Sequence, residues 1–201
     1  MESNDAKEIA NAVKTVINNC IITRGVKVDN LSTFDIEYLF LNIRGKSVGE
    51  EVDVLITCPD DEVTQVPVSI SLDDIKVVVD PDHNKDIKLD NSLTLRMKYP
   101  SLSQFVKSNF AGEDDMTIDD TFKMISSCVD QIYNEEESWT GADSTEKELK
   151  DFLEQLTSTQ FKEIEKFFET MPKLSHKIKV KNPNTGVESE VALEGLTSFF
   201  A

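Results

Sequence analysis

Apolar residues recur at helical spacing near the start of the chain. Four of them share one face of a helix over residues 5–20, with Ile17 beside them: Ile9, Val13, Val16 and Cys20. The pattern predicts an amphipathic helix. Residues 33–44 are apolar almost all round, which fits a buried helix or a central strand. Their length, a Ser32/Asp35 cap pair and Gly45 as a stop favour the helix.

From residue 51 the apolar positions alternate with polar ones, as in half-buried strands. Turn-forming residues such as Asp80-Pro81 separate the runs, and Pro67 inside one run places that strand at a sheet edge. The pattern predicts an antiparallel β-meander of four or five strands, built on the runs 52–56, 66–72, 75–79, 87–89 and 93–97.

Helical spacing returns after residue 101. Three apolar stripes each follow a Thr with an acidic or amide side chain three residues later, as in a capping box: Thr117/Asp120, Thr145/Glu148 and Thr157/Gln160. The first predicted helix carries its stripe from Ile118 through Ile125 to Val129 and Ile132.

Met171-Pro172 closes the last helix. Residues 176–181 and 187–193 are typical of a β-hairpin around the turn 182–186, before an apolar tail. The predicted fold class is α+β: N-terminal helices, an antiparallel β-meander, an acidic helical segment, and a C-terminal β-hairpin with a short terminal helix. The predicted regions are 1–110, 111–170 and 171–201, forming one or two compact units without a clear linker.

Charge is concentrated in the middle region. The chain of 201 residues has a net charge of −17, and residues 111–170 hold 17 acidic and 5 basic residues, a net −12. This balance opposes binding to nucleic acid and to anionic membranes, where Lys and Arg replace counterions. No apolar run is long enough to span a bilayer and no signal peptide is evident. Three widely spaced cysteines (Cys20, Cys58 and Cys128) suit a reducing compartment, so we expect a soluble cytoplasmic protein.

Catalytic and cofactor motifs are weak. Gly45-Lys46-Ser47 matches the end of a phosphate-binding loop, but Phe40 stands where the first Gly is required. A helix end followed by a turn explains these residues better. The histidines His83 and His176 have no accompanying nucleophile or metal signature, and we expect no enzyme and no cofactor.

Two metal patterns are also incomplete. The series Asp80, Asp82, Asn84 and Asp86 alternates like a calcium loop, but Lys85 and Asn91 replace its required Gly and Glu. A polar turn is the better interpretation.

The segments 58–62 and 182–186 each have the strand–Pro turn–strand outline of a zinc-ribbon knuckle. The four ligand positions of such a ribbon would be Cys58, Asp61, Asn182 and Thr185, and Asn and Thr bind zinc poorly. We therefore expect no metal. Knuckle-like geometry without metal and two ordinary hairpins remain equal alternatives.

The C-terminal residues Leu196, Phe199 and Phe200 form an apolar cluster. One hypothesis docks this cluster on the core of the chain or in self-association, and the other inserts it as a hook into a partner. We favour the first and keep these three residues as candidate partner-binding residues.

Two stretches carry a family resemblance: residues 34–50, with Phe34-Asp35-Ile36-Glu37-Tyr38 and Arg44-Gly45-Lys46-Ser47, and residues 167–174 with the terminal 193–200. The chain resembles the T4-like bacteriophage baseplate protein family, specifically the hub assembly proteins of that group, in colinear order from about residue 28. Relatives in that family carry fuller C-P-x-C knuckles.

The resemblance implies a late phage protein in the host cytoplasm that helps to assemble the central hub of the tail baseplate without being an enzyme. Implied partners are other hub proteins and the tape-measure protein. The alternative is a permanent hub subunit that stays in the virion. A zinc-ribbon nucleic-acid binder is disfavoured by its missing ligands and its charge.

Complementary charge could hold apolar or basic surfaces of such partners. We therefore expect the acidic faces of 111–170 to contribute to the partner site, in particular Glu135, Glu136, Glu137 and the adjacent Trp139. The alternative for Trp139 is a contact with a small satellite core.

Overall fold

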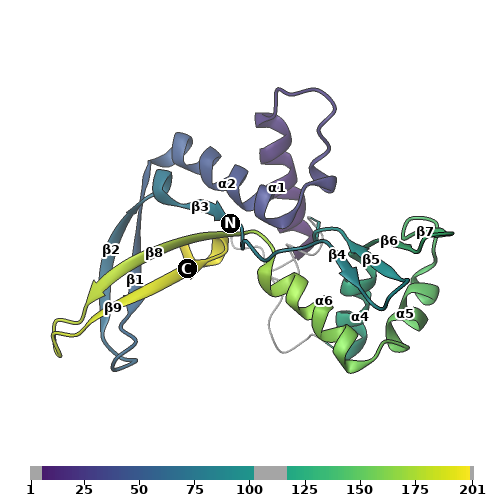
Figure 1. The fold of residues 1–201 in the computed structure, drawn as a ribbon. Helices are drawn as coiled ribbons and strands as arrows, with labels where there is room; N and C mark the ends of the chain where they lie inside the picture. The colour runs from purple at the N-terminus through teal and green to yellow at the C-terminus, as the bar shows by residue number, and fades with distance from the viewer. Residues whose placement is uncertain (1–5, 102–116, 200–201) are drawn as a thin grey trace. The chain divides into compact units, whose positions relative to one another are not determined.

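The computed structural model describes residues 6–101 and 117–199, with the side chains of 6–10 and 197 left out of the description (Figure 1). Within these ranges the chain is mixed α+β, with five α-helices and three small antiparallel sheets. It forms two compact units. Unit 1 contains the residues up to Val78 and those from Pro172 onward, and unit 2 contains Val79–Met171.

Unit 1 begins with two helices, α1 (Ala6–Cys20) and α2 (Thr33–Val48), separated by the short 3₁₀-helix η1 (Val28–Asn30). Both predicted helices are confirmed. The buried face of α1 differs from the prediction, because Val13 and Ile17 are buried whereas Val16 and Cys20 are exposed. Spacing alone defines a stripe of neighbouring positions, and contact with the rest of the unit selects the part of that stripe that becomes buried.

Helix α2 is packed on one side only, since Tyr38 and Val48 are exposed although the apolar sequence favours a buried helix. It buries Phe34, Ile36 and Leu41, and also the carboxylate residue Glu37. The predicted stop at Gly45 is wrong, since the helix continues to Val48 and ends at Gly49. Gly45 instead lies against Leu72, because a Cβ at this position would be 3.1 Å from the Leu72 Cδ1 atom.

The strands of unit 1 form two sheets. Strands β1 (Glu51–Thr57) and β2 (Gln65–Ser71) form a hairpin, and the alternating burial of β1 matches the predicted period of two. After the 3₁₀-helix η2 (Leu72–Asp74), β3 (Lys76–Val78) pairs with β8 (Lys173–Lys181), which pairs with β9 (Glu188–Glu194). The predicted C-terminal hairpin is therefore confirmed, and the 3₁₀-helix η4 (Leu196–Phe199) follows it.

Unit 2 contains a four-stranded antiparallel sheet in the order β4-β5-β6-β7 and three helices. The strands are β4 (Asp86–Lys88), β5 (Thr94–Met97), β6 (Val129–Tyr133) and β7 (Ser138–Thr140), and the helices are α4 (Ile118–Ser127), α5 (Glu146–Glu154) and α6 (Ser158–Thr170). All three predicted capping boxes are present, at Thr117, Thr145 and Thr157.

The predicted strand pairing and the extent of one predicted helix are wrong. The single meander over 51–97 is divided among three sheets, because β3 pairs with the distant β8 and β5 pairs with β6. The stripe that reached Val129 and Ile132 is not one helix. Helix α4 ends at Ser127, and Val129–Tyr133 is strand β6. The three-residue spacing of Val129 and Ile132 fits one face of a helix, but pairing with β5 makes this segment a strand.

Candidate functional site

A row of apolar side chains crosses the sheet of unit 2 and ends at its last strand. The register pairs Ile87 with Leu95, Leu95 with Ile132, and Ile132 with Trp139. Residues directly opposite one another lie on the same face of a sheet, so these four side chains form one continuous row. The row begins in the core, where Leu95 is fully buried, and ends at Trp139, which is 45% exposed.

The exposed end of this row opens into a groove of about 640 Å³ between β7 and α5. Its apolar lining comes from both elements and from the neighbouring strands: Leu93, Ile132, Trp139, Leu149 and Phe152. Trp139 was predicted as a partner-binding residue from its acidic surroundings. The structure adds the groove, which we call the Trp139 groove.

The surroundings of the groove are acidic. The turn from β6 to β7 holds Glu135, Glu136 and Glu137 in exposed positions. Asn134 stabilises this turn, because its side-chain oxygen accepts hydrogen bonds from the backbone N–H groups of Glu136 (2.8 Å) and Glu137 (2.7 Å). The three glutamate side chains are therefore presented next to β7 on an ordered turn.

Two further carboxylates, Asp143 and Glu148, line the groove itself, and the described residues that line it include no Lys or Arg. Hydrogen bonds from the backbone and side chain of Thr145 hold the pKa of Glu148 below its usual value. This carboxylate is therefore charged at neutral pH. The groove combines an apolar floor with negative charge, which is complementary to a segment that carries apolar and basic side chains.

Two of the three C-terminal candidates are buried in unit 1. Leu196 and Phe199 are 5% and 0% exposed, and Phe200 lies outside the described residues. Their burial agrees with docking on the core, so acting as a hook would require them to leave this position. Gly195 makes the preceding turn at φ = 72°, a conformation that glycine adopts readily.

Helix α2 contributes a buried acid that the sequence did not reveal. Glu37 is 7% exposed, and its side chain accepts a hydrogen bond from the backbone N–H of Leu196 at 3.4 Å. Burial raises the pKa of Glu37 to about 7. A carboxyl group that holds a proton over much of the range below pH 7 is therefore part of the contact between α2 and the C-terminal segment.

The two predicted knuckles lie against each other in unit 1. The side-chain amide of Asn182 donates to Asp60 at 3.1 Å and to Asp61 at 2.9 Å, and Thr185 Oγ1 donates to Asp60 at 2.5 Å. Asn184 adds a bond to Thr64 at 3.0 Å. Three of the four proposed ligand positions therefore meet through hydrogen bonds, and we call this network the hairpin clamp.

The hairpin clamp orients its own central residue. Asn182 is 1% exposed, and its side-chain oxygen accepts from the backbone N–H groups of Asn184 (2.8 Å) and Thr185 (3.4 Å). Hydrogen bonds from Thr64 and Asn182 lower the pKa of Asp61 well below its usual range. Its carboxylate is therefore a charged acceptor at any ordinary pH.

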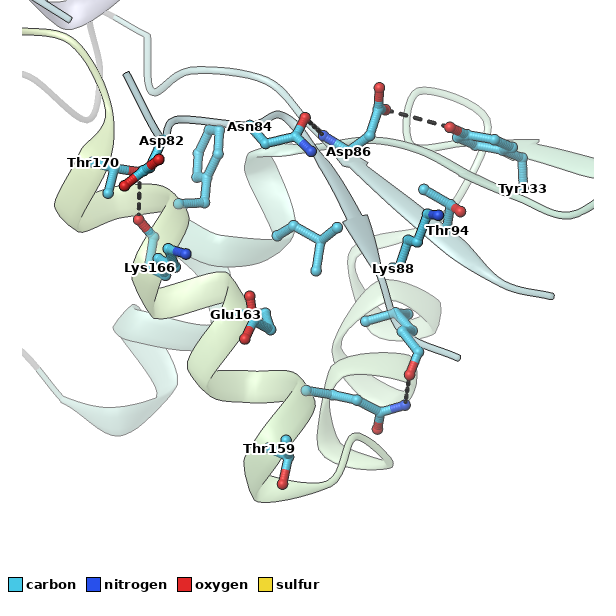
Figure 2. Close-up of a pocket in the computed structure, with 14 residues that line it drawn as sticks. Asp82, Asn84, Asp86, Lys88, Thr94, Tyr133, Thr159, Glu163, Lys166 and Thr170 are labelled. Atoms are coloured by element: carbon cyan, nitrogen blue, oxygen red, sulfur yellow. Dashed lines mark hydrogen bonds between the residues drawn. The ribbon is translucent and has the colours of Figure 1, made fainter. Parts of the chain in front are cut away.

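A second hollow of about 590 Å³ lies between β4 and α6 in unit 2 (Figure 2). Asp82, Asn84 and Asp86, from the incomplete calcium pattern, line it. Asn84 accepts from the Asp86 backbone N–H at 3.0 Å, and Asp86 pairs with Arg96 at 2.6 Å. Over residues 6–101 and 117–199, no group of three or more His, Cys, Asp or Glu side chains is placed to hold a metal ion.

The remaining motif residues have structural contacts. Lys46 lies in the last turn of α2 and pairs at 2.6 Å with Glu50, just beyond the end of the helix. His83 contacts Thr170 and Tyr99 through its two ring nitrogens, each at 3.0 Å, and stacks on Tyr99. His176 approaches the backbone oxygen of Asp74 at 3.3 Å.

The fold and site define a two-unit α+β protein with an acidic and apolar groove in unit 2. Over residues 1–201 the chain matches the model of the family described as T4 bacteriophage base plate protein. This chain therefore belongs to the T4 bacteriophage base plate protein family.

Comparison with curated protein sequences and with solved structures finds no match. Family membership implies that the protein binds other baseplate proteins. No helix in the part of the chain that the structure describes is long and apolar enough to cross a membrane.

Proposed function

We propose that this protein is a non-enzymatic assembly factor for the central hub of the phage tail baseplate. It acts in the host cytoplasm by binding other hub proteins, with the tape-measure protein as a further candidate partner. The observation that carries the proposal is the apolar row that ends at the half-exposed Trp139 beside Glu135–Glu137. An exposed aromatic residue in a groove is the usual form of an anchor for a partner.

The acidic turn, which is the turn from β6 to β7 with Glu135, Glu136 and Glu137, would speed the association with a partner. Carboxylates at the rim of an interface raise the rate of association with a basic partner more than they stabilise the complex. A negative surface also disfavours nucleic acid, which a hub assembly factor meets in an infected cell. The Trp139 groove and the acidic turn therefore act on different steps, with the groove slowing dissociation and the turn accelerating association.

The test is capture of hub proteins from infected cells by the purified chain. Trp139→Ala should weaken capture, and lysine at positions 135, 136 and 137 should slow capture and flatten its salt dependence. The matched control places lysine at Glu163, Glu165 and Glu169, which are exposed on α6 of the same unit and give the same change of charge. Unchanged capture at low salt by the 135–137 variant would contradict the proposed role of the turn.

The second candidate is a permanent structural subunit of the hub, which membership in a baseplate family also supports. Mass spectrometry of mature particles distinguishes the two. An assembly factor should be absent from the particle, whereas a subunit should be present at a fixed copy number. The same measurement tests self-association, because a subunit that forms oligomers should have a copy number per particle that is a multiple of the number of chains in one oligomer.

A further inference from the structure

Among the residues that the structure describes, β7 is the last strand of the four-stranded sheet and pairs only with β6. All three of its residues, Ser138–Thr140, are exposed. In Figure 1 it lies at the outer end of the order β4-β5-β6-β7, with α5 close to it. An exposed edge strand offers unpaired backbone groups to a further strand.

The hydrogen-bond pattern shows which backbone groups of β7 face outward. The Asn134 N–H donates to the Glu137 oxygen (2.9 Å), and the Gly141 N–H donates to the Asp130 oxygen (2.7 Å). Because hydrogen-bonded pairs alternate along an antiparallel ladder, Trp139 and Ile132 form the hydrogen-bonded pair between them. The backbone groups of Ser138 and Thr140 then point away from β6.

Part of this outward edge is already used. The Thr140 oxygen accepts from the Asp143 N–H (3.2 Å) and from Ser144 Oγ (3.0 Å), in the turn that leads to α5. Within residues 6–101 and 117–199, three outward groups of β7 have no backbone partner and can pair with another strand: the N–H and C=O of Ser138 and the N–H of Thr140. This set of two donors and one acceptor suits one short strand.

The apolar row points to the same conclusion independently of the backbone. Ile87, Leu95, Ile132 and Trp139 occupy successive strands on one face, so Ile87 and Trp139 are the two ends of the row. Ile87 is 6% exposed, whereas Trp139 is 45% exposed, so only the Trp139 end offers apolar surface to a further strand. A strand added to β7 would place one of its residues directly opposite Trp139, in a non-hydrogen-bonded pair whose side chains approach closely. That residue would enter the Trp139 groove and complete the row.

We propose that the partner binds as an extended segment that adds a fifth strand to the β7 edge, with an apolar residue opposite Trp139 and Lys or Arg residues beside it. This inference rests on the proposed function and specifies the chemistry of the partner at the same site. The choice of basic residues follows from charge. Glu135, Glu136 and Glu137 precede β7, and Asp143 and Glu148 line the groove, where the part of the chain that the structure describes places no Lys or Arg.

Synthetic peptides test this mode of binding. The probe is an acetylated, amidated peptide that alternates Lys with Leu or Thr, such as Lys-Thr-Lys-Leu-Lys-Thr-Lys. Trp139 is the only Trp in the chain, so its fluorescence reports occupation of the groove. A control peptide has the same sequence but carries N-methyl groups at the residues whose backbone N–H groups would point toward β7. It keeps every side chain and loses those N–H donors, so it should bind at least about tenfold more weakly. Replacing Lys by Glu should abolish binding.

Protein variants test the strand edge from the other side. Ser138→Pro removes an outward N–H that the ladder to β6 does not use, and proline is tolerated on edge strands. Ser138→Ala is the matched control, because it keeps the backbone N–H. The proline variant should bind at least about tenfold more weakly than the alanine variant. Circular dichroism and thermal unfolding check that both fold, and amide exchange should show slower exchange at Ser138 and Thr140 only when peptide is bound.

Three results would overturn strand addition: equal binding of the N-methylated peptide, equal binding by the proline and alanine variants, or slow exchange of both amides in the free protein. Capture of hub proteins without any effect of these changes would leave the proposed function standing and refute the strand mode. Peptide binding without capture of hub proteins would support the strand mode and refute the proposed function.

Discussion

The side-chain nitrogen of Asn182 lies 2.9 Å from a carboxylate oxygen of Asp61, although 121 residues separate the two in the chain. This contact joins the turn of the β1–β2 hairpin to the turn of the β8–β9 hairpin. Asn182 satisfies both ends of its amide there, because its oxygen accepts backbone N–H groups of its own turn. One side chain therefore fixes a local turn and a long-range contact together.

Asn182→Ala should destabilise unit 1. The change removes three hydrogen bonds to carboxylate oxygens and two acceptor contacts from a residue that is 1% exposed. Loss of a buried, fully bonded polar side chain lowers the free energy of unfolding by about 1–3 kcal/mol. Urea denaturation measures the change. Asn84→Ala is the control, because Asn84 makes a similar bond within its own turn in unit 2 but is exposed. Equal effects of the two changes would contradict a special role for the hairpin clamp.

Glu37 should make the stability of unit 1 fall as pH rises. Its pKa is about 7 in the folded protein against an ordinary value of 4.5. Between these values the folded state holds a proton that the unfolded state has released, so the free energy of unfolding decreases from pH 4.5 to pH 7. A shift of this size corresponds to a loss of about 3 kcal/mol.

Glu37→Gln should remove this decline, because Gln stays neutral and keeps an oxygen to accept from the Leu196 N–H. Urea denaturation at several pH values between 4 and 8 measures it for both proteins. Glu50→Gln is the control, since Lys46 lowers the pKa of Glu50, which is an exposed residue. Parallel pH curves for the wild type and Glu37→Gln would show that Glu37 is not buried as described.

Phe199→Ala should strongly destabilise unit 1, because the side chain is fully buried. Truncation of a buried Phe to Ala costs about 3–5 kcal/mol. Thermal and urea unfolding measure the loss, and Val187→Ala, at a 45% exposed position near β9, should cost far less. Unchanged stability of Phe199→Ala, combined with loss of partner binding, would instead support the apolar tail as a hook.

Gly141→Ala should be among the most damaging changes in unit 2. A Cβ at this position would lie 2.2 Å from the backbone oxygen of Val129, and a backbone atom cannot move aside as a side chain can. We expect a loss of about 3 kcal/mol or more.

Gly45→Ala is the matched comparison for this change. Its Cβ would meet the side-chain Cδ1 of Leu72 at 3.1 Å, and alanine favours the helix, so we expect a change within about 1 kcal/mol. Equal unfolding free energies for the two variants would contradict the close approach at Gly141.

Local signals in the sequence were sufficient for the capped helices. Thr145 and Glu148 show why, since the acceptor and donor of a capping box lie three residues apart and the bonds form within one turn. The strand β6 shows the limit. Val129 and Ile132 fit a helical stripe, and only pairing with β5 makes them a strand. The meander prediction failed for the same reason, because the partner of β3 is almost 100 residues further along the chain.

The candidate site was predictable in part. The acidic turn and Trp139 stand out in the sequence as charge beside an aromatic residue. The row that ends at Trp139 depends on the register of three strand pairs, which no local pattern contains. The zinc-ribbon outline predicted similar turns at 58–62 and 182–186 but gave no means of knowing that hydrogen bonds join them. Glu37 looked like any other surface acid of a helix, because burial of a single carboxylate depends on the elements packed around it.

The pairing of β3 with β8 also affects how the protein is made. On a bacterial ribosome that adds about 5–20 residues per second, β3 waits roughly 5–20 s for its partner strand to be synthesised. The sheet of unit 2 needs only residues that lie between those two strands. During translation, therefore, unit 2 can complete its sheet first, while the N-terminal part of unit 1 remains a nascent segment with an unpaired strand.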